Sequence, residues 1–149
     1  MTEVLFYHLE RRPLEAVLPA LLEKCLERGW KAVVQGGSPE RLDAIDGVLW
    51  TYREDSFLPH GTVADGDPAF QPIYLTTDTD NLNDATVRFL IDGAEPPDLA
   101  GYQRAIFIFD GRDSDAVAQA RVHWKQASGQ GHAVTYWQQN DAGRWERKA

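Results

Sequence analysis

A short run in the last quarter of the chain combines cationic and aromatic side chains at helical spacing. Arg121 and Lys125 are four residues apart, and Trp124 follows Arg121 by three. On a helix, residues at these separations are surface neighbours. Two cations beside an indole ring suit a carboxylate that is flanked by an apolar side chain. We therefore interpret this helix face as a candidate site for a peptide carboxylate.

The distribution of charge supports a local rather than a general anion site. The net charge is −8, which argues against sequence-independent binding to a nucleic-acid backbone, because such binding needs a broad cationic surface. Residues 38–115 contain 16 acidic and 5 basic side chains, whereas residues 116–149 contain 2 acidic and 5 basic ones. A local positive potential can attract an acidic partner although the whole molecule is acidic. The alternative is a solvated helix face beside a charged tail.

The usual catalytic and metal-binding motifs are missing from the sequence. Cys25 is the only cysteine, and the four histidines have no metal-ligand spacing. There is no P-loop, and Gly36–Gly37 lacks the third glycine of a dinucleotide fingerprint. We predict no catalytic residue, no cofactor and no metal ion.

Alternating strand and helix signals predict the elements that position the candidate site. The patterns predict strands at residues 3–7, 30–35, 72–76, 86–91, 104–109 and 133–138, and helices at residues 13–28, 39–50 and 113–129. This alternation is typical of an α/β fold. We predict a Rossmann-like three-layer arrangement, with a mostly parallel central sheet, helices on both faces and no nucleotide-binding loop.

The length and the remaining segments complete the expected organisation. The 149 residues predict a single domain, 1–149. No apolar run approaches the roughly 18 residues of a membrane span, and the first residues lack a signal-peptide pattern, so we expect a cytoplasmic protein. Pro19 leaves the start of the first helix open. The lack of periodicity in residues 53–71 predicts a long loop. This loop contains an apolar cluster, Phe57–His60, which must pack against another part of the protein.

Several residues, taken in chain order, resemble the chi subunit family of DNA polymerase III. The resemblance covers nearly the whole chain, and its ending is similar to the alphaproteobacterial branch. It rests on Leu49–Trp50, Ser56–His60, Pro72–Ile73, the Arg121, Trp124 and Lys125 set, Gly131–His132, Tyr136–Asn140 and Gly143–Glu146.

The resemblance implies a non-catalytic accessory subunit of the bacterial replicase that binds no nucleotide. Members of the family bind the acidic C-terminal tail of single-stranded DNA-binding protein, and many also bind the psi subunit, which links them to the clamp loader. Val117 departs from the family pattern, since better-known members have a lysine there. Carried over to this chain, the tail site comprises Trp50, Phe57, Arg121, Trp124 and Lys125, with Pro59 and His60 in a supporting loop.

The physical chemistry of these residues agrees with the resemblance. We predict that Trp50, Phe57 and Trp124 wall one apolar slot for the terminal side chain, while the Arg121 guanidinium binds the carboxylate through two hydrogen bonds. Structural roles are the alternatives: core packing for Trp50, loop anchoring for Phe57 and Pro59, a loop hydrogen bond for His60 and inward packing for Trp124.

Two other functions remain open at this point. A small α/β enzyme could bind a nucleotide or another small ligand at the strand ends near Gly36 and Gly37. Direct DNA binding conflicts with the acidic total. The surface for a second partner such as psi or another clamp-loader subunit is also open, with the first helix, Trp30 and Trp145 as candidates.

Overall fold

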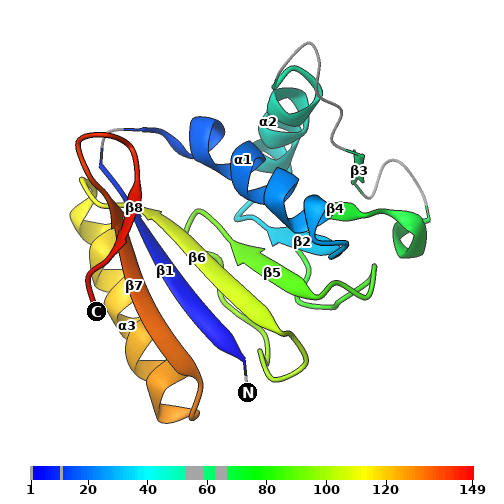
Figure 1. The fold of residues 1–149 in the computed structure, drawn as a ribbon. Helices are drawn as coiled ribbons and strands as arrows, with labels where there is room; N and C mark the ends of the chain where they lie inside the picture. The colour runs from blue at the N-terminus through cyan, green and yellow to red at the C-terminus, as the bar shows by residue number, and fades with distance from the viewer. Residues whose placement is uncertain (1, 11, 53–58, 63–66) are drawn as a thin grey trace.

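The computed structural model describes residues 2–10, 12–52, 59–62 and 67–149. These residues form one twisted sheet with helices packed on it (Figure 1). In chain order the elements are β1 (Glu3–Leu9), α1 (Leu14–Glu27), β2 (Ala32–Gln35), α2 (Pro39–Trp50), β3 (His60–Gly61), the 3-10 helix η2 (Pro68–Phe70), β4 (Ile73–Thr76), β5 (Val87–Leu90), β6 (Arg104–Asp110), α3 (Ser114–Gly129), β7 (Ala133–Gln139) and β8 (Trp145–Arg147).

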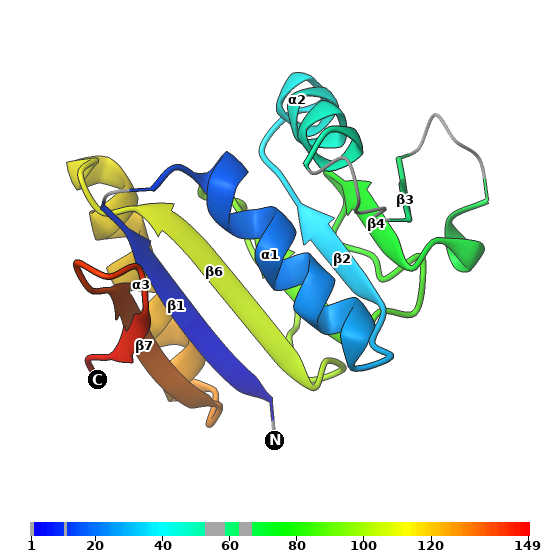
Figure 2. The same cartoon turned by 45° about the horizontal axis from the view of Figure 1, so that its top comes forward.

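The sheet confirms the predicted α/β class. Its strand order is β3-β4-β2-β5-β6-β1-β7-β8, and every neighbouring pair is parallel except β7 with β8. Helices α1 and α2 lie on one face, and α3 lies on the other (Figure 2). Within the described ranges, no helix has the length and apolar character that crossing a membrane requires.

Two strands were not predicted from the sequence, and both lie at an edge of the sheet. β3 has only two residues and falls inside the predicted long loop, while β8 forms the arm around Trp145. Strands this short carry too few residues for an alternating pattern to show. Their hydrogen bonds cover the outer edges of β4 and β7.

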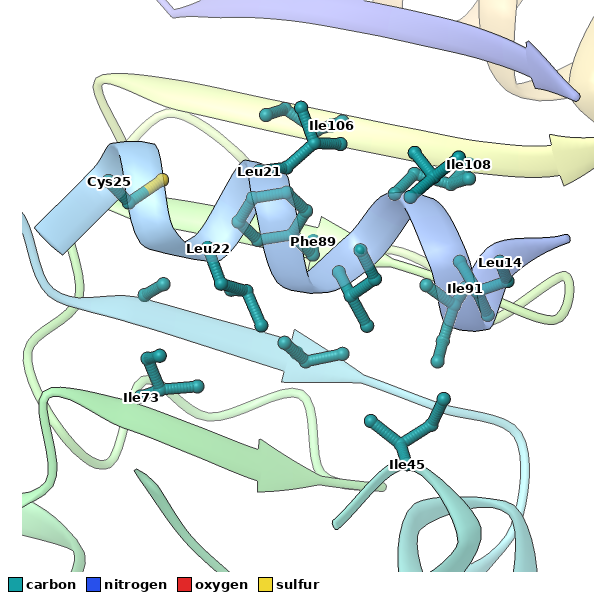
Figure 3. Close-up of a cluster of buried hydrophobic side chains, with 14 of the residues drawn as sticks. Leu14, Leu21, Leu22, Cys25, Ile45, Ile73, Phe89, Ile91, Ile106 and Ile108 are labelled. Atoms are coloured by element: carbon teal, nitrogen blue, oxygen red, sulfur yellow. The ribbon is translucent and has the colours of Figure 1, made fainter. Parts of the chain in front are cut away.

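Helix α1 continues through Pro19. Proline removes one helical hydrogen bond, but the apolar stripe of the helix packs closely on the sheet, with Leu21 and Leu22 directed toward the strands (Figure 3). The helix ends at Glu27, followed by Gly29 with a φ of +74°. Glycine adopts this left-handed conformation without steric cost, so it stops the helix as predicted.

The hydrophobic core has two parts, one on each face of the sheet. On the α1 and α2 face, helix residues such as Leu22 and Ile45 pack with Phe89 and Ile106 (Figure 3). On the opposite face, α3 packs through its small residues Ala120 and Ala127 against another set of strand residues, Val4, Phe6, Ala105 and Phe107. Strand side chains alternate between faces, so β1 and β6 contribute to both parts.

Candidate functional site

Helix α3 presents the predicted cationic and aromatic side chains over the sheet. Asp113 caps its first turn by accepting hydrogen bonds from the backbone N–H groups of Asp115 (3.0 Å) and Ala116 (3.4 Å). Ala120 faces the sheet. The next residue, Arg121, is therefore rotated outward and exposed, whereas Trp124, one turn on, is half-buried.

A cavity of about 390 Å³ lies between α3 and strands β1, β6 and β7. This volume is within the range of small-ligand sites, roughly 300–1,000 Å³. Most of its walls are apolar, and His8, Arg121, Trp124 and Tyr136 are the lining side chains that carry polar atoms. The lining residues are Phe6, His8, Phe109, Val117, Ala120, Arg121, Trp124, Tyr136 and Ala149.

Aromatic rings form the floor and one wall of this α3 pocket. Measured between centroids, the Trp124 indole lies 5.4 Å from the Phe6 ring, in a tilted arrangement, and 6.1 Å from the Tyr136 ring, in an edge-on arrangement. Phe109 lies 6.1 Å from Tyr136 on the same floor. Tilted contacts of this kind are favourable. Trp124 therefore packs inward and borders the pocket at the same time.

Arg121 is a cation at the rim of the α3 pocket. Among the described residues it forms no hydrogen bond and no ion pair, and the same holds for the exposed Lys125. Lys125 does not line the pocket, but it follows Arg121 by one helical turn. An unpaired guanidinium beside an apolar cavity is available to a carboxylate from another molecule.

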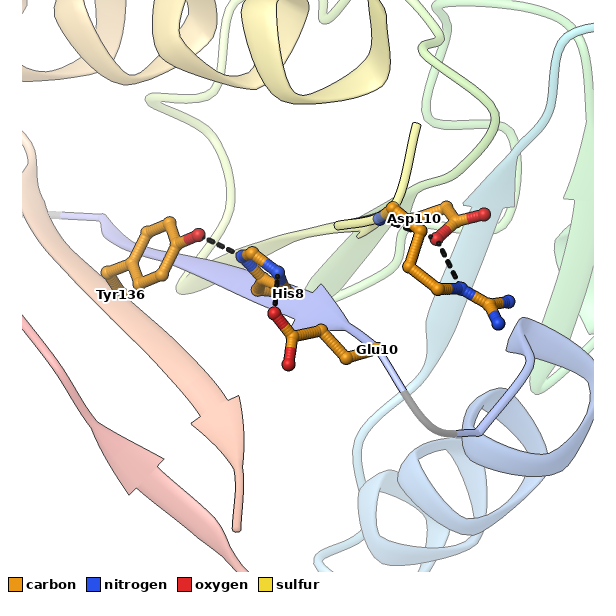
Figure 4. Close-up of polar contacts among 5 residues, drawn as sticks. His8, Glu10, Asp110 and Tyr136 are labelled. Carbon is orange, nitrogen blue, oxygen red and sulfur yellow. Dashed lines mark hydrogen bonds and ion pairs between the residues drawn. The ribbon is translucent and has the colours of Figure 1, made fainter. Parts of the chain in front are cut away.

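Two polar side chains on the pocket floor are linked to each other. His8 Nδ1 is hydrogen-bonded to the Tyr136 hydroxyl, and His8 Nε2 lies 3.1 Å from Glu10 Oε1 (Figure 4). Burial raises the pKa of Tyr136, and the Glu10 carboxylate raises it further, while the nearby Arg121 guanidinium lowers it. The Tyr136 hydroxyl therefore keeps its proton at neutral pH.

The structure does not bring Trp50 to the α3 pocket. Trp50 ends α2, on the opposite face of the sheet, and α2 packs with the α1 part of the core. Its ring is 55% exposed and lies 4.7 Å from the buried His60 ring. A slot walled by both Trp50 and Trp124 is therefore not formed, because their helices cover different faces.

The remaining loop residues belong to the Trp50 side as well. His60 is on β3 and its Nε2 lies 2.9 Å from Asp46 Oδ1, which agrees with a loop-fixing role. Pro59 is half-buried next to it. Phe57 lies outside the described residues, so its predicted place in the site stays a prediction.

Four ring-bearing residues of the pocket were not predicted as part of the site: Phe6, His8, Phe109 and Tyr136. They lie on three strands that are distant in the sequence and meet only through the parallel pairing of β1 with β6 and β7. Alternate positions on β1 point to one face, which is the only sequence signal that groups Phe6 with His8. Val117, noted as a missing cation, forms part of the apolar wall.

A second cavity, about 520 Å³, lies at the carboxyl ends of β5, β6 and β1. Small ligands bind at such strand ends in many α/β enzymes. Here Arg41 is already engaged by Glu15 (2.7 Å) and Asp92 (2.9 Å). Acidic residues outnumber arginines in the lining, which disfavours a phosphate-bearing ligand.

Comparison with known proteins adds an independent line of information. A sequence model of the family described as "DNA polymerase III chi subunit, HolC" matches residues 1–135. The chain is also similar to the "Probable DNA polymerase III subunit chi" of Rickettsia prowazekii (strain Madrid E). The two are 28% identical over 159 residues, which cover 100% of this chain and 93% of that protein. The family match includes every residue lining the α3 pocket except Tyr136 and Ala149.

Proposed function

Since this chain belongs to the DNA polymerase III chi subunit family, we propose that its α3 pocket binds the acidic C-terminal tail of single-stranded DNA-binding protein. Family membership itself supports an accessory role in replication. The tail as ligand is our inference, and one observation carries it: Arg121, an exposed cation with no partner among the described residues, borders an aromatic cavity.

The energetics indicate how much of the tail must be bound. Burying a terminal phenylalanine ring contributes roughly 1.5–3 kcal/mol, and a hydrogen bond from a charged group contributes a similar amount. Together these fall short of the roughly 8 kcal/mol of a micromolar complex. Upstream acidic residues of the tail must therefore also contact the protein, and Lys125, one turn beyond Arg121, is placed to meet them.

Binding of a synthetic acidic peptide that ends in phenylalanine tests the proposal by calorimetry. We expect micromolar affinity for the intact protein and at least about tenfold weaker binding for Arg121→Ala, with an unchanged melting temperature. Arg112→Ala is the matched control, because Arg112 is 70% exposed and lines the other cavity. Unchanged binding by Arg121→Ala would overturn the proposal.

We further propose that the Trp50 end of the molecule carries the link to the clamp loader, through psi or another subunit. Trp50 is 55% exposed, and Phe70, which follows β3, is 79% exposed. The other candidate tryptophans are less exposed: Trp30 is half-buried and contacts Arg28 and Arg104, and Trp145 is half-buried and stacks on Tyr7 at 4.5 Å. Tryptophan is one of the side chains enriched among the residues that dominate binding energy near the centre of protein interfaces.

A pull-down from lysate separates the two proposed surfaces. Trp50→Ala should lose the clamp-loader subunits while retaining single-stranded DNA-binding protein, and Arg121→Ala should show the reverse. Loss of both partners in either variant, with the fold intact, would contradict two independent surfaces.

A further inference from the structure

The direction of the hydrogen bond between His8 and Tyr136 decides what the floor of the α3 pocket offers to a ligand. A carboxylate can only accept hydrogen bonds, so the contact with Glu10 places the hydrogen of a neutral His8 ring on Nε2. His8 Nδ1 then accepts from the Tyr136 hydroxyl. In this state the Tyr136 oxygen presents only lone pairs to the pocket.

Protonation of His8 reverses this arrangement. The added proton comes from solvent and sits on Nδ1, which then donates to the Tyr136 oxygen. The hydroxyl hydrogen of Tyr136 becomes free to turn into the pocket. Tyr136 thus changes from an acceptor suited to a peptide N–H into a donor suited to a carboxylate, next to Arg121.

We propose that His8 sets the hydrogen-bonding role of Tyr136 in the α3 pocket and makes capture of a peptide's terminal carboxylate stronger at mildly acidic pH. This inference rests on the proposed tail-binding function and concerns the regulation of the same site. His8 acts as a positioning residue, since it works through Tyr136.

The surroundings of His8 are consistent with such coupling. Its side chain is 14% exposed, with the Glu10 carboxylate on its own strand end, Tyr136 on β7 and the Phe109 ring 5.3 Å away on β6. A carboxylate in the pocket can accept the Tyr136 hydroxyl hydrogen only when that hydrogen is not directed at His8 Nδ1, so bound peptide and a proton on Nδ1 favour each other.

The close approach of the β6 turn fixes the ring. A Cβ added at Gly111 would lie 1.7 Å from His8 Nε2 and 2.1 Å from Cδ2. With any larger residue at position 111, the His8 imidazole could not keep this position. The ring is therefore held between Gly111 and Tyr136, with Glu10 in contact, and has a defined orientation.

The test is calorimetry at about pH 8 and about pH 6, using the acidic peptide with a free terminal carboxylate. Binding sites coupled through one element typically change each other's affinity by about fivefold or more. We expect at least that gain at the lower pH, together with proton uptake when buffers of different ionisation enthalpy are compared. The same peptide with a C-terminal amide should show no gain.

Three variants test whether the His8–Tyr136 pair causes the pH dependence of peptide binding. His8→Asn keeps an acceptor near the Nδ1 position but cannot titrate, and Tyr136→Phe removes the hydroxyl, so each should bind with the same Kd at both pH values. His132 precedes β7 and does not line the pocket. The control variant His132→Gln should therefore keep the pH dependence of peptide binding. Melting curves verify the fold, and Tyr136→Phe carries the test alone if His8→Asn does not fold.

The outcomes separate this inference from the proposed function. If the intact protein binds the peptide through Arg121 but equally at both pH values, or if His8→Asn and Tyr136→Phe keep the pH effect, this inference is overturned while tail binding stands. If the intact protein does not bind the peptide at either pH, the tail-binding function itself fails.

Discussion

At the scale of single residues, the proposed site depends on a cation that the fold leaves unpaired. Two other arginines show the contrast: Arg41 contacts two carboxylates, and Arg88, fully buried, donates to Gln35, to Tyr102 and to loop carbonyls. Arg121 has no such contact among the described residues. A guanidinium that the fold does not use is available for a partner.

Val117 offers a residue-scale prediction. It lines the α3 pocket one turn before Arg121, where the family resemblance implies a lysine. Val117→Lys can extend its ammonium to the rim while its stem covers the wall. An added partly exposed ion pair is worth up to about 1 kcal/mol, so tail-peptide affinity should rise about two- to fivefold and fall with added salt. Calorimetry at two salt concentrations checks this; weaker binding would mean that the wall must stay apolar.

Cys25 gives a prediction about stability at alkaline pH. Burial raises the pKa of this thiol from 9.0 to about 11, against the lowering influence of Arg104 and Arg28. The folded state therefore holds the proton more tightly than the unfolded state. This contribution to the free energy of unfolding, on the order of 3 kcal/mol, is present in full below about pH 9 and is lost as the pH rises through about 11.

Urea unfolding from pH 8 to pH 11 measures the effect. The free energy of unfolding of the intact protein should fall steeply above pH 9. That of Cys25→Ala should be lower at pH 8, because the substitution leaves a small cavity, but it should fall less as the pH rises. Equal declines in both proteins would assign the loss to other groups, such as Tyr7, whose pKa burial also raises.

At the scale of elements, sequence spacing predicted which side chains share one helix face. It did not predict which helices and strands come together in the folded sheet. Arg121 and Trp124 share a face because helical spacing is a local property. The prediction that Trp50 walls the same slot is wrong, because α2 and α3 cover opposite faces of the sheet. Sequence spacing carries no information about which face of the sheet a helix covers. The partners of Trp124, on β1 and β7, were missed for the same reason.

Alanine substitutions at two glycines should change the stability of the protein in opposite directions, which tests where α1 ends and that α2 continues through Gly47. Gly47 lies inside α2, where an added Cβ meets nothing within 4 Å, whereas Gly29 follows α1 with a φ of +74°. Gly47→Ala should stabilise the protein by about 0.5–1 kcal/mol. Gly29→Ala should destabilise it by about 1 kcal/mol, because alanine is strained there. Chemical denaturation checks both values, and the same sign for both would contradict one of the assignments.

At the scale of the whole molecule, the sheet separates two surfaces with different chemistry. The α3 face carries an aromatic pocket bordered by Arg121, a cation with no partner among the described residues. At the other end, Trp50 and Phe70 are exposed, and α2 lies near the short strand β3 (Figure 1). The net charge of −8 lies mainly away from α3. Under the proposed function, the acidic tail would bind on the α3 side and a subunit of the replicase at the Trp50 end.

The most direct measurement is NMR titration of the protein with the acidic tail peptide, observing backbone amides and the indole N–H signals of its five tryptophans. The account predicts that the largest shifts fall on Val117, Arg121, Trp124 and Tyr136, including the Trp124 indole, while the Trp50 indole stays unchanged. Shifts centred on Trp50 and His60, with α3 unaffected, would contradict it.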